Sequence, residues 1–82
     1  MKKEKKKEYL KYLEKIFKKV LNDEKLTLKE NTTTKSLKKW DSLNHIKLIL
    51  ACEKFYKVKF NINDINKIDS VNKIINLLIK MK

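Results

Sequence analysis

Apolar residues recur at spacings of three and four along most of this chain, which is the pattern of amphipathic helices. Over residues 4–22 the recurring residues are Tyr9, Leu10, Leu13, Ile16, Phe17, Val20 and Leu21. The opposite side carries lysines, and glutamates three or four residues away moderate their mutual repulsion. The spacing therefore predicts a first helix over residues 4–22.

Residues 23–41 lose this spacing and contain a polar cluster at residues 31–34. Three scattered leucines interrupt the polar segment: Leu26, Leu28 and Leu37. A loop of this length is uncommon in a small domain unless it is functional or packed down by its own apolar residues. We expect a long loop that these leucines hold against the core.

A second helix is predicted to start at Asp41 or Ser42 and to end near residue 57, because both side chains are good N-caps. Its inward stripe is predicted as Leu43, Ile46, Ile49, Leu50 and Tyr56, with Cys52 at the inner edge. Two interpretations of Ser42 stay open at this point. The hydroxyl either caps the helix or stands out at the helix start in order to be modified.

The rest of the chain predicts one short helix and one final helix. Asn61 or Asn63 is the expected cap of the short helix, in which Ile62, Ile65 and Ile68 are predicted to point inward. Asp69 is the expected cap of the final helix, whose inward face is predicted as Val71, Ile74, Ile75, Leu78 and Ile79. Gly and Pro are absent and no segment alternates cleanly, so the expected fold is an all-α bundle of three main helices and one short helix.

Length and cysteine content narrow the class of protein. A chain of 82 residues suffices for one small core, so we expect residues 1–82 to form a single domain. Cys52 is the sole cysteine, which excludes an internal disulfide and a zinc site of the usual Cys/His spacing. The basic start lacks the continuous apolar core of a signal peptide, and no apolar run nears the roughly 20 residues that cross a bilayer. We expect a cytoplasmic protein.

The formal net charge of +12 raises nucleic acid, an acidic protein or an anionic membrane as a partner. Lys, Asn and Ile are all abundant, however, and drift in an A+T-rich genome would produce the same charge without any anionic ligand. Glu4, Glu8 and Glu14 interrupt the basic start, and no recognition-helix motif is present. The basic amphipathic segment 4–22 also suits an anionic membrane surface. These alternatives stay open, whereas an enzyme is disfavoured because His45 has no catalytic companions in the sequence.

Residues 40–79 resemble one known family. The similarity lies in the order of features: D-S-L at a helix start (residues 41–43), Tyr56 closing that helix, then Phe60, a short helix, and I-D-S-V (residues 68–71) opening the last helix. In this order the chain resembles the acyl carrier proteins, small four-helix bundles that carry thioester intermediates on a 4′-phosphopantetheine arm. The first half matches less well, because Leu37 lies about one residue off the usual register.

The resemblance implies that Ser42 is the attachment residue for a covalent 4′-phosphopantetheine. A phosphodiester there would face unpaired backbone N–H groups and the positive end of the helix dipole. By the same resemblance, Asp41 helps the phosphopantetheinyl transferase to recognise the site and Leu43 offers it an apolar contact. The residues expected to contact a partner or the acyl chain are then Trp40, Leu50, Phe60 and Ile65. Each of them also suits a packing role. Trp40, for example, would pack over the loop. A carrier of this kind has no catalytic residues and no metal site.

The implied partners are the transferase, an acyl-activating ligase, and an acyltransferase or ketosynthase of fatty-acid or other lipid biosynthesis. The family usually docks through an acidic second helix, but Lys47 and Lys54 stand in this one. Because complementary charge steers docking, we expect a dedicated partner set rather than general fatty-acid enzymes. Trp40 before D-S-L resembles the pattern of stand-alone carriers of specialised pathways.

We expect a monomer that binds no nucleic acid and has no membrane span. The alternative is a small basic helical protein that binds nucleic acid or an anionic membrane surface.

Overall fold

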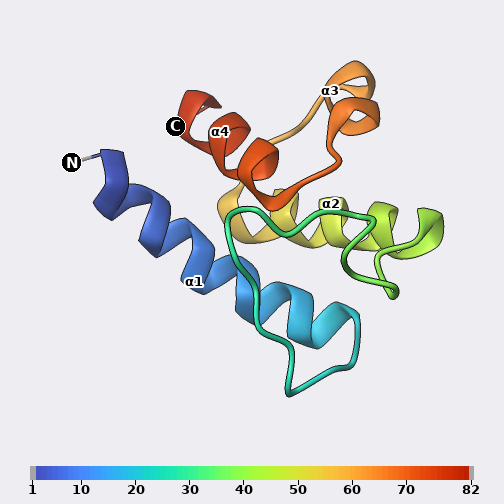
Figure 1. The fold of residues 1–82 in the computed structure, drawn as a ribbon. Helices are drawn as coiled ribbons and strands as arrows, with labels where there is room; N and C mark the ends of the chain where they lie inside the picture. Colours follow the sequence, from blue (N-terminus) through green and yellow to red (C-terminus); the bar gives the residue numbers. More distant parts are fainter. Residues whose placement is uncertain (1, 82) are drawn as a thin grey trace.

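Helices joined by loops make up the fold (Figure 1). The computed structural model describes residues 2–81, with side chains from residue 6 onward. Within this range the helices are α1 (Lys2–Val20), α2 (Ser42–Tyr56), α3 (Ile62–Lys67) and α4 (Val71–Met81), and no strand is present. Helix α1 packs against both α2 and α4. The predicted all-α bundle of three main helices and one short helix is confirmed.

The buried apolar residues form one cluster to which every helix except α3 contributes. Helices α1 and α4 bury the faces that their spacing predicted, with Leu13 and Phe17 on α1 and Ile74, Ile75 and Leu78 on α4. Their burial supplies the main driving force for packing the helices together. The fold therefore rests on an amphipathic α1 and α4 that close around α2.

The long loop is packed down, as its leucines predicted. Leu26 and Leu28 are buried, and Leu37 packs against the core from the loop. The Leu28 backbone N–H donates to the Glu14 carboxylate of α1 at 2.9 Å. Further along, Thr33 pairs with Ser70 in an isolated antiparallel bridge, so the loop also meets the start of α4. These bonds give the polar loop backbone the partners that its burial requires.

The inward stripe predicted for α2 is wrong for three of its members. Leu43, Ile46 and Leu50 are 66%, 50% and 58% exposed. The buried residues of α2 are instead Leu48, Ile49, Cys52 and Tyr56. Both sets follow helical spacing, so α2 carries two apolar stripes, and only the packing against α1 and the rest of the core decides which one is buried. On α3, Ile62 is likewise 74% exposed, whereas Ile65 is half-buried against the core and Ile68, just after the helix, is buried.

The predicted cap of the last helix also needs correction. Ser70, not Asp69, directly precedes α4, and its hydroxyl accepts a hydrogen bond from the Lys73 backbone N–H at 3.3 Å. The carbonyl of Asp69 accepts the N–H of Thr34, and the Asp69 carboxylate pairs with the Lys73 ammonium at 3.1 Å. Two adjacent residues were both suitable caps, and the pairing with the loop places Ser70 at the helix start. For α3 the choice falls on Asn61, which accepts the N–H of Asp64 at 2.8 Å.

Helix α2 ends in a strained residue that offers a stability test. Lys57 has left-handed backbone angles, φ 56° and ψ 47°, which cost a residue with a Cβ atom more than they cost glycine. We expect Lys57→Gly to raise the free energy of unfolding by about 0.5–1 kcal/mol in a urea titration. Lys59→Gly is the matched control, because it removes the same charge at a position without a positive φ. Equal effects of the two changes would contradict the explanation.

Cys52 predicts a dependence of stability on alkaline pH. Burial, with a smaller contribution from Glu53, raises the pKa of its thiol from 9.0 to about 12. Above pH 9 the unfolded chain loses the thiol proton while the folded chain keeps it, so stability declines as pH rises toward 12. From pH 8 to pH 10 this one group should remove roughly 1.4 kcal/mol of stability.

The measurement compares urea unfolding of the wild type with that of Cys52→Ala at both pH values. The wild type should be the more stable protein at pH 8, because truncation leaves a small cavity. Its advantage should shrink, or reverse, at pH 10. A difference that stays constant between the two pH values would show that the thiol does not remain protonated in the fold.

Candidate functional site

The start of α2 is organised by Asp41. This residue has an extended backbone, and its carboxylate accepts the Asn44 backbone N–H at 2.9 Å while its carbonyl accepts that of His45 at 2.8 Å. Both bonds are those of an N-cap. Of the two candidate caps in the sequence, Asp41 therefore takes the role, and Ser42 becomes the first residue of the helix.

Ser42 is exposed at the N-terminus of this 15-residue helix. The hydrogen bonds around the helix start involve Asp41, Asn44 and His45, and none within the described residues uses the Ser42 hydroxyl. The first turn contains no acidic residue. Its unpaired N–H groups and the helix dipole favour a negative charge at this end. The hydroxyl is thus free, reachable and placed where a phosphate ester would be stabilised.

Trp40 anchors the end of the loop just before this site. Its side chain is only 3% exposed, and its ring lies edge-on against Phe17 of α1 with ring centroids 5.1 Å apart. The indole N–H donates to Nδ1 of His45 at 2.9 Å. The backbone between Trp40 and Ser42 is therefore held at both ends, by the core and by the cap.

His45 joins three parts of the molecule, a role that sequence reasoning missed. Its Nε2 lies 3.1 Å from the carbonyl oxygen of Ile65 in α3. The indole of Trp40 can only donate and a carbonyl can only accept, so together they require the tautomer with its proton on Nε2. The W-x-x-x-x-H spacing was the one sequence signal available, and it carries little weight without the structure. His45 thereby links the loop, α2 and α3.

A groove of about 630 Å³ opens beside Ser42, between the loop, α2 and α3. Its lining residues are Thr34, Trp40, Asp41, Ser42, His45, Ile46, Ile65, Asn66 and Ile68. Of the predicted contact residues, Ile65 lines this groove, as does the edge of Trp40. Leu50 lies outside it on the exposed face of α2, and Phe60 is buried in the core. Leu43 is exposed immediately after Ser42.

The exposed face of α2 continues from this site as an apolar stripe. Leu43, Ile46 and Leu50 are three or four residues apart and so lie on one face of the helix. Exposed large apolar residues that cluster on one face, rather than scatter singly, commonly mark an interaction surface. We refer to these three residues as the α2 stripe.

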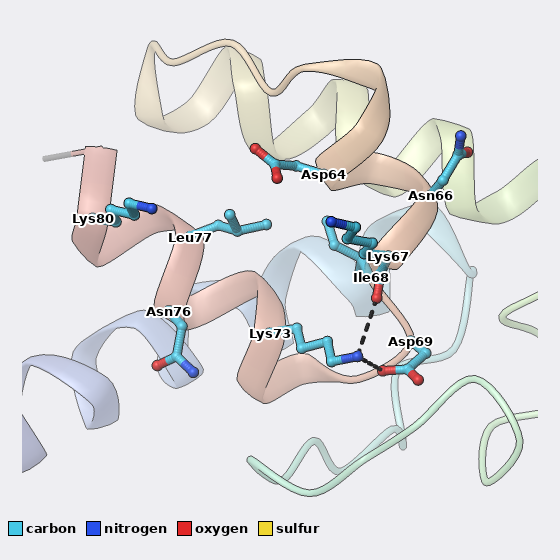
Figure 2. Close-up of a pocket in the computed structure, with 9 residues that line it drawn as sticks. All are labelled: Asp64, Asn66, Lys67, Ile68, Asp69, Lys73, Asn76, Leu77 and Lys80. Carbon is cyan, nitrogen blue, oxygen red and sulfur yellow. Dashed lines mark hydrogen bonds and ion pairs between the residues drawn. The ribbon is translucent and has the colours of Figure 1, made fainter.

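A second groove, of about 550 Å³, lies between α3 and α4 and shares Asn66 and Ile68 with the first. Figure 2 shows Lys73 reaching across its end to the Asp69 carboxylate and, at 3.3 Å, to the carbonyl of Lys67. These bonds connect the end of α3 to the first turn of α4. The groove contains no free nucleophile, so we interpret this cluster as a structural connection rather than a site.

The division of roles at the helix start can be tested by stability alone. Asp41→Ala should lower the free energy of unfolding by about 1 kcal/mol, because it removes the cap bond to Asn44. Ser42→Ala should change it by less than about 0.5 kcal/mol, because the hydroxyl has no bond to lose. Urea unfolding of both variants measures the difference. A larger loss for Ser42→Ala would show that Ser42 is the true cap.

Within the described residues, no helix is both long and apolar enough to cross a membrane. Comparisons with models of protein families and with curated proteins found no match. Among solved structures, the solution NMR structure of the holo acyl carrier protein from Geobacter metallireducens is similar. It is 33% identical in sequence with a TM-score of 0.81, over 88% of this chain and 83% of that one. The chain therefore belongs to the acyl carrier protein family, whose members are carriers rather than enzymes.

Proposed function

We propose that this protein carries acyl groups as thioesters on a 4′-phosphopantetheine attached to the hydroxyl of Ser42. The observation that carries the proposal is the free hydroxyl of Ser42 at the start of α2, with Asp41 acting as the cap in its place. A serine whose role was to cap the helix would make that bond itself. The similar carrier from Geobacter metallireducens is a holo protein, which supports a prosthetic group here.

The residues around Ser42 suit this group in charge and in polarity. Asp41 accepts the N–H groups of Asn44 and His45, so the phosphate would face those of Ser42 and Leu43 at the positive end of the helix dipole. The groove beside Ser42 has polar walls at Thr34 and Asn66 and apolar walls at Ile46 and Ile65. Such a mixed lining fits an arm that contains both amide and methylene groups. When bound, the group supplies the thiol that carries the acyl chain, and its tether raises the effective concentration of that chain at a partner enzyme.

The α2 stripe is proposed to contact partner proteins. Leu43 adjoins Ser42 and would meet the phosphopantetheinyl transferase, and Asp41 would be recognised by the same enzyme in addition to capping the helix. Leu50 continues the same face toward the middle of α2 and would contact enzymes that load or use the acyl group. Because these side chains are already exposed, docking would bury apolar surface without unfolding any part of the carrier.

The acyl chain is proposed to contact Ile65 directly, in a bundle whose shape depends on Trp40 and Phe60. Ile65 lines the groove beside Ser42, whereas Trp40 and Phe60 are buried and shape the bundle around it. An acyl chain would thus meet Ile65 first. Contact with Phe60 would require the chain to enter the core.

The partner set proposed from the sequence is a dedicated one. Lys47 and Lys54 are exposed on α2 beside the α2 stripe, so the docking face is basic. An enzyme with a basic docking patch would be repelled by it. We therefore propose a carrier of a specialised pathway. We also propose that it is a monomeric, cytoplasmic, single-domain protein. It would be loaded by an acyl-activating ligase and unloaded by an acyltransferase or ketosynthase.

The intact mass of the protein tests the attachment site. After incubation with coenzyme A, Mg²⁺ and a broad-specificity phosphopantetheinyl transferase, the wild type should gain the mass of one phosphopantetheine. Ser42→Ala should gain nothing, because it lacks the oxygen that accepts the phosphate. Ser36→Ala is the control: it removes an exposed serine hydroxyl that bonds to Thr33 in the loop, and it should be modified like the wild type.

A foreign transferase could be repelled by the basic face, so the same assay is repeated with the transferase from the protein's own genome. The proposal is wrong if neither enzyme adds mass to protein that circular dichroism shows to be helical. It is also wrong if Ser42→Ala is modified as fully as the wild type. Either result would leave Ser42 as an ordinary exposed helix residue.

A further inference from the structure

A third groove lies between α1 and α2 and shares no lining residue with the groove beside Ser42. Its volume is about 650 Å³, and both helices contribute side chains to it. Figure 1 shows that α1 and α2 form one side of the bundle, with α3 beyond α2. We refer to this feature as the α1–α2 groove.

Lysines line both sides of the α1–α2 groove. Lys15 and Lys19 come from α1, one turn apart, and Lys47 and Lys54 come from α2, two turns apart. All four are exposed, and no acidic residue lines the groove. The described ion pairs, Lys18 with Glu14 and Lys73 with Asp69, do not involve them. The groove therefore presents two facing rows of positive charge that no neighbouring carboxylate neutralises.

The floor of the groove is apolar. Ile16, Val20 and Ala51 also line it and are buried or half-buried where the lysines are exposed, so they form its floor. At one end stand Tyr12 and Phe55, which are 43% and 52% exposed and contact each other with ring centroids 5.4 Å apart. Exposed aromatic pairs of this kind supply much of the affinity at protein interfaces. An occupant must therefore offer a narrow apolar face flanked by negative charge.

We propose that the α1–α2 groove docks an acidic amphipathic helix of a partner protein. Such a helix would lay its apolar stripe on the floor and direct carboxylates on its two flanks toward the lysines of α1 and α2. A nucleic-acid backbone would satisfy the lysines but has no apolar stripe for the floor. A bilayer surface is flat, so it would meet the lysines and leave the concave floor uncovered. The combination of charge and shape favours the helix.

The place of the groove connects it to the start of α2. Lys47 follows Ser42 by five residues, which is about 7.5 Å along a helix axis. A partner held in the groove would therefore stand close to Ser42 and to the α2 stripe. That the partner is an enzyme acting on a carried acyl group rests on the proposed function, whereas the binding of an acidic helix to the groove does not.

The test is a titration of the ¹⁵N-labelled full-length protein with a synthetic helical peptide of about 18 residues, enough for five turns. Its sequence has leucines along one face and glutamates on both flanks. We expect saturable 1:1 binding, with the largest amide shifts in α1 and α2 around the groove. Replacing the glutamates by glutamine should weaken binding about tenfold or more, and so should raising the salt from 50 to 300 mM.

Variants assign the binding to the groove. Lys19→Glu with Lys47→Glu should weaken the peptide at least about tenfold. The control, Lys35→Glu with Lys80→Glu, changes the net charge equally at exposed positions outside the groove and should change the affinity less than about threefold. Phe55→Ala should weaken binding at unchanged charge. If the glutamate variant loses its helical circular dichroism, Lys19→Gln with Lys47→Gln replaces it, with Lys35→Gln and Lys80→Gln as its control.

Several outcomes would overturn the proposal. The first is the absence of saturable amide shifts at the groove. The second is an equal loss of peptide affinity in the groove variant and in the control variant. The third is a glutamine peptide that binds as tightly as the glutamate peptide. Parallel titrations use vesicles of phosphatidylglycerol and phosphatidylcholine and a 20-base-pair DNA duplex. If either binds at the groove while the peptide does not, the occupant is a membrane or nucleic acid instead. Ser42→Ala should bind the peptide like the wild type. Peptide binding therefore tests the groove independently of whether Ser42 is modified.

Discussion

The buried indole of Trp40 determines where the candidate site lies. Its ring contacts Phe17 of α1, and its N–H bonds to His45 of α2, which in turn reaches the carbonyl of Ile65 in α3. An indole N–H buried without a partner would be costly, so this arrangement admits few alternatives. The loop before Trp40 is long and polar, and this anchor, together with the bond that the Asn44 side chain donates to the carbonyl of Lys39, fixes how the loop enters α2.

Once the loop end is held, Asp41 and Ser42 divide two tasks that either could perform. Asp41 completes the first turn of α2, and Ser42 keeps a free hydroxyl at the positive end of the helix. The helix then continues as an exposed apolar stripe with lysines beside it. The same short element thus combines a free serine hydroxyl, an exposed apolar stripe and positive charge.

Local rules acting on the sequence determined most of the secondary structure. Helical spacing placed α1 and α4 and their buried faces, and the absence of Gly and Pro disfavoured β-hairpins. The position of D-S-L before a helical segment predicted the start of α2 within one residue. The leucines of the loop predicted that it packs against the core, because these apolar side chains lie outside any predicted helix and can be buried only in that way. Each of these inferences depends on residues a few positions apart, which is why the sequence sufficed.

The tertiary structure decided the rest, because it depends on which surfaces meet. Helix α2 has two apolar stripes of equal helical spacing, and only its packing against α1 and the rest of the core buries Ile49 and leaves Leu50 in solvent. Asp69 and Ser70 were both suitable caps until the loop paired with the start of α4. His45 gained its role from residues five and twenty positions away. The sequence by itself determined the helices and the candidate serine, whereas packing between distant segments decided which faces are buried and which partners His45 binds.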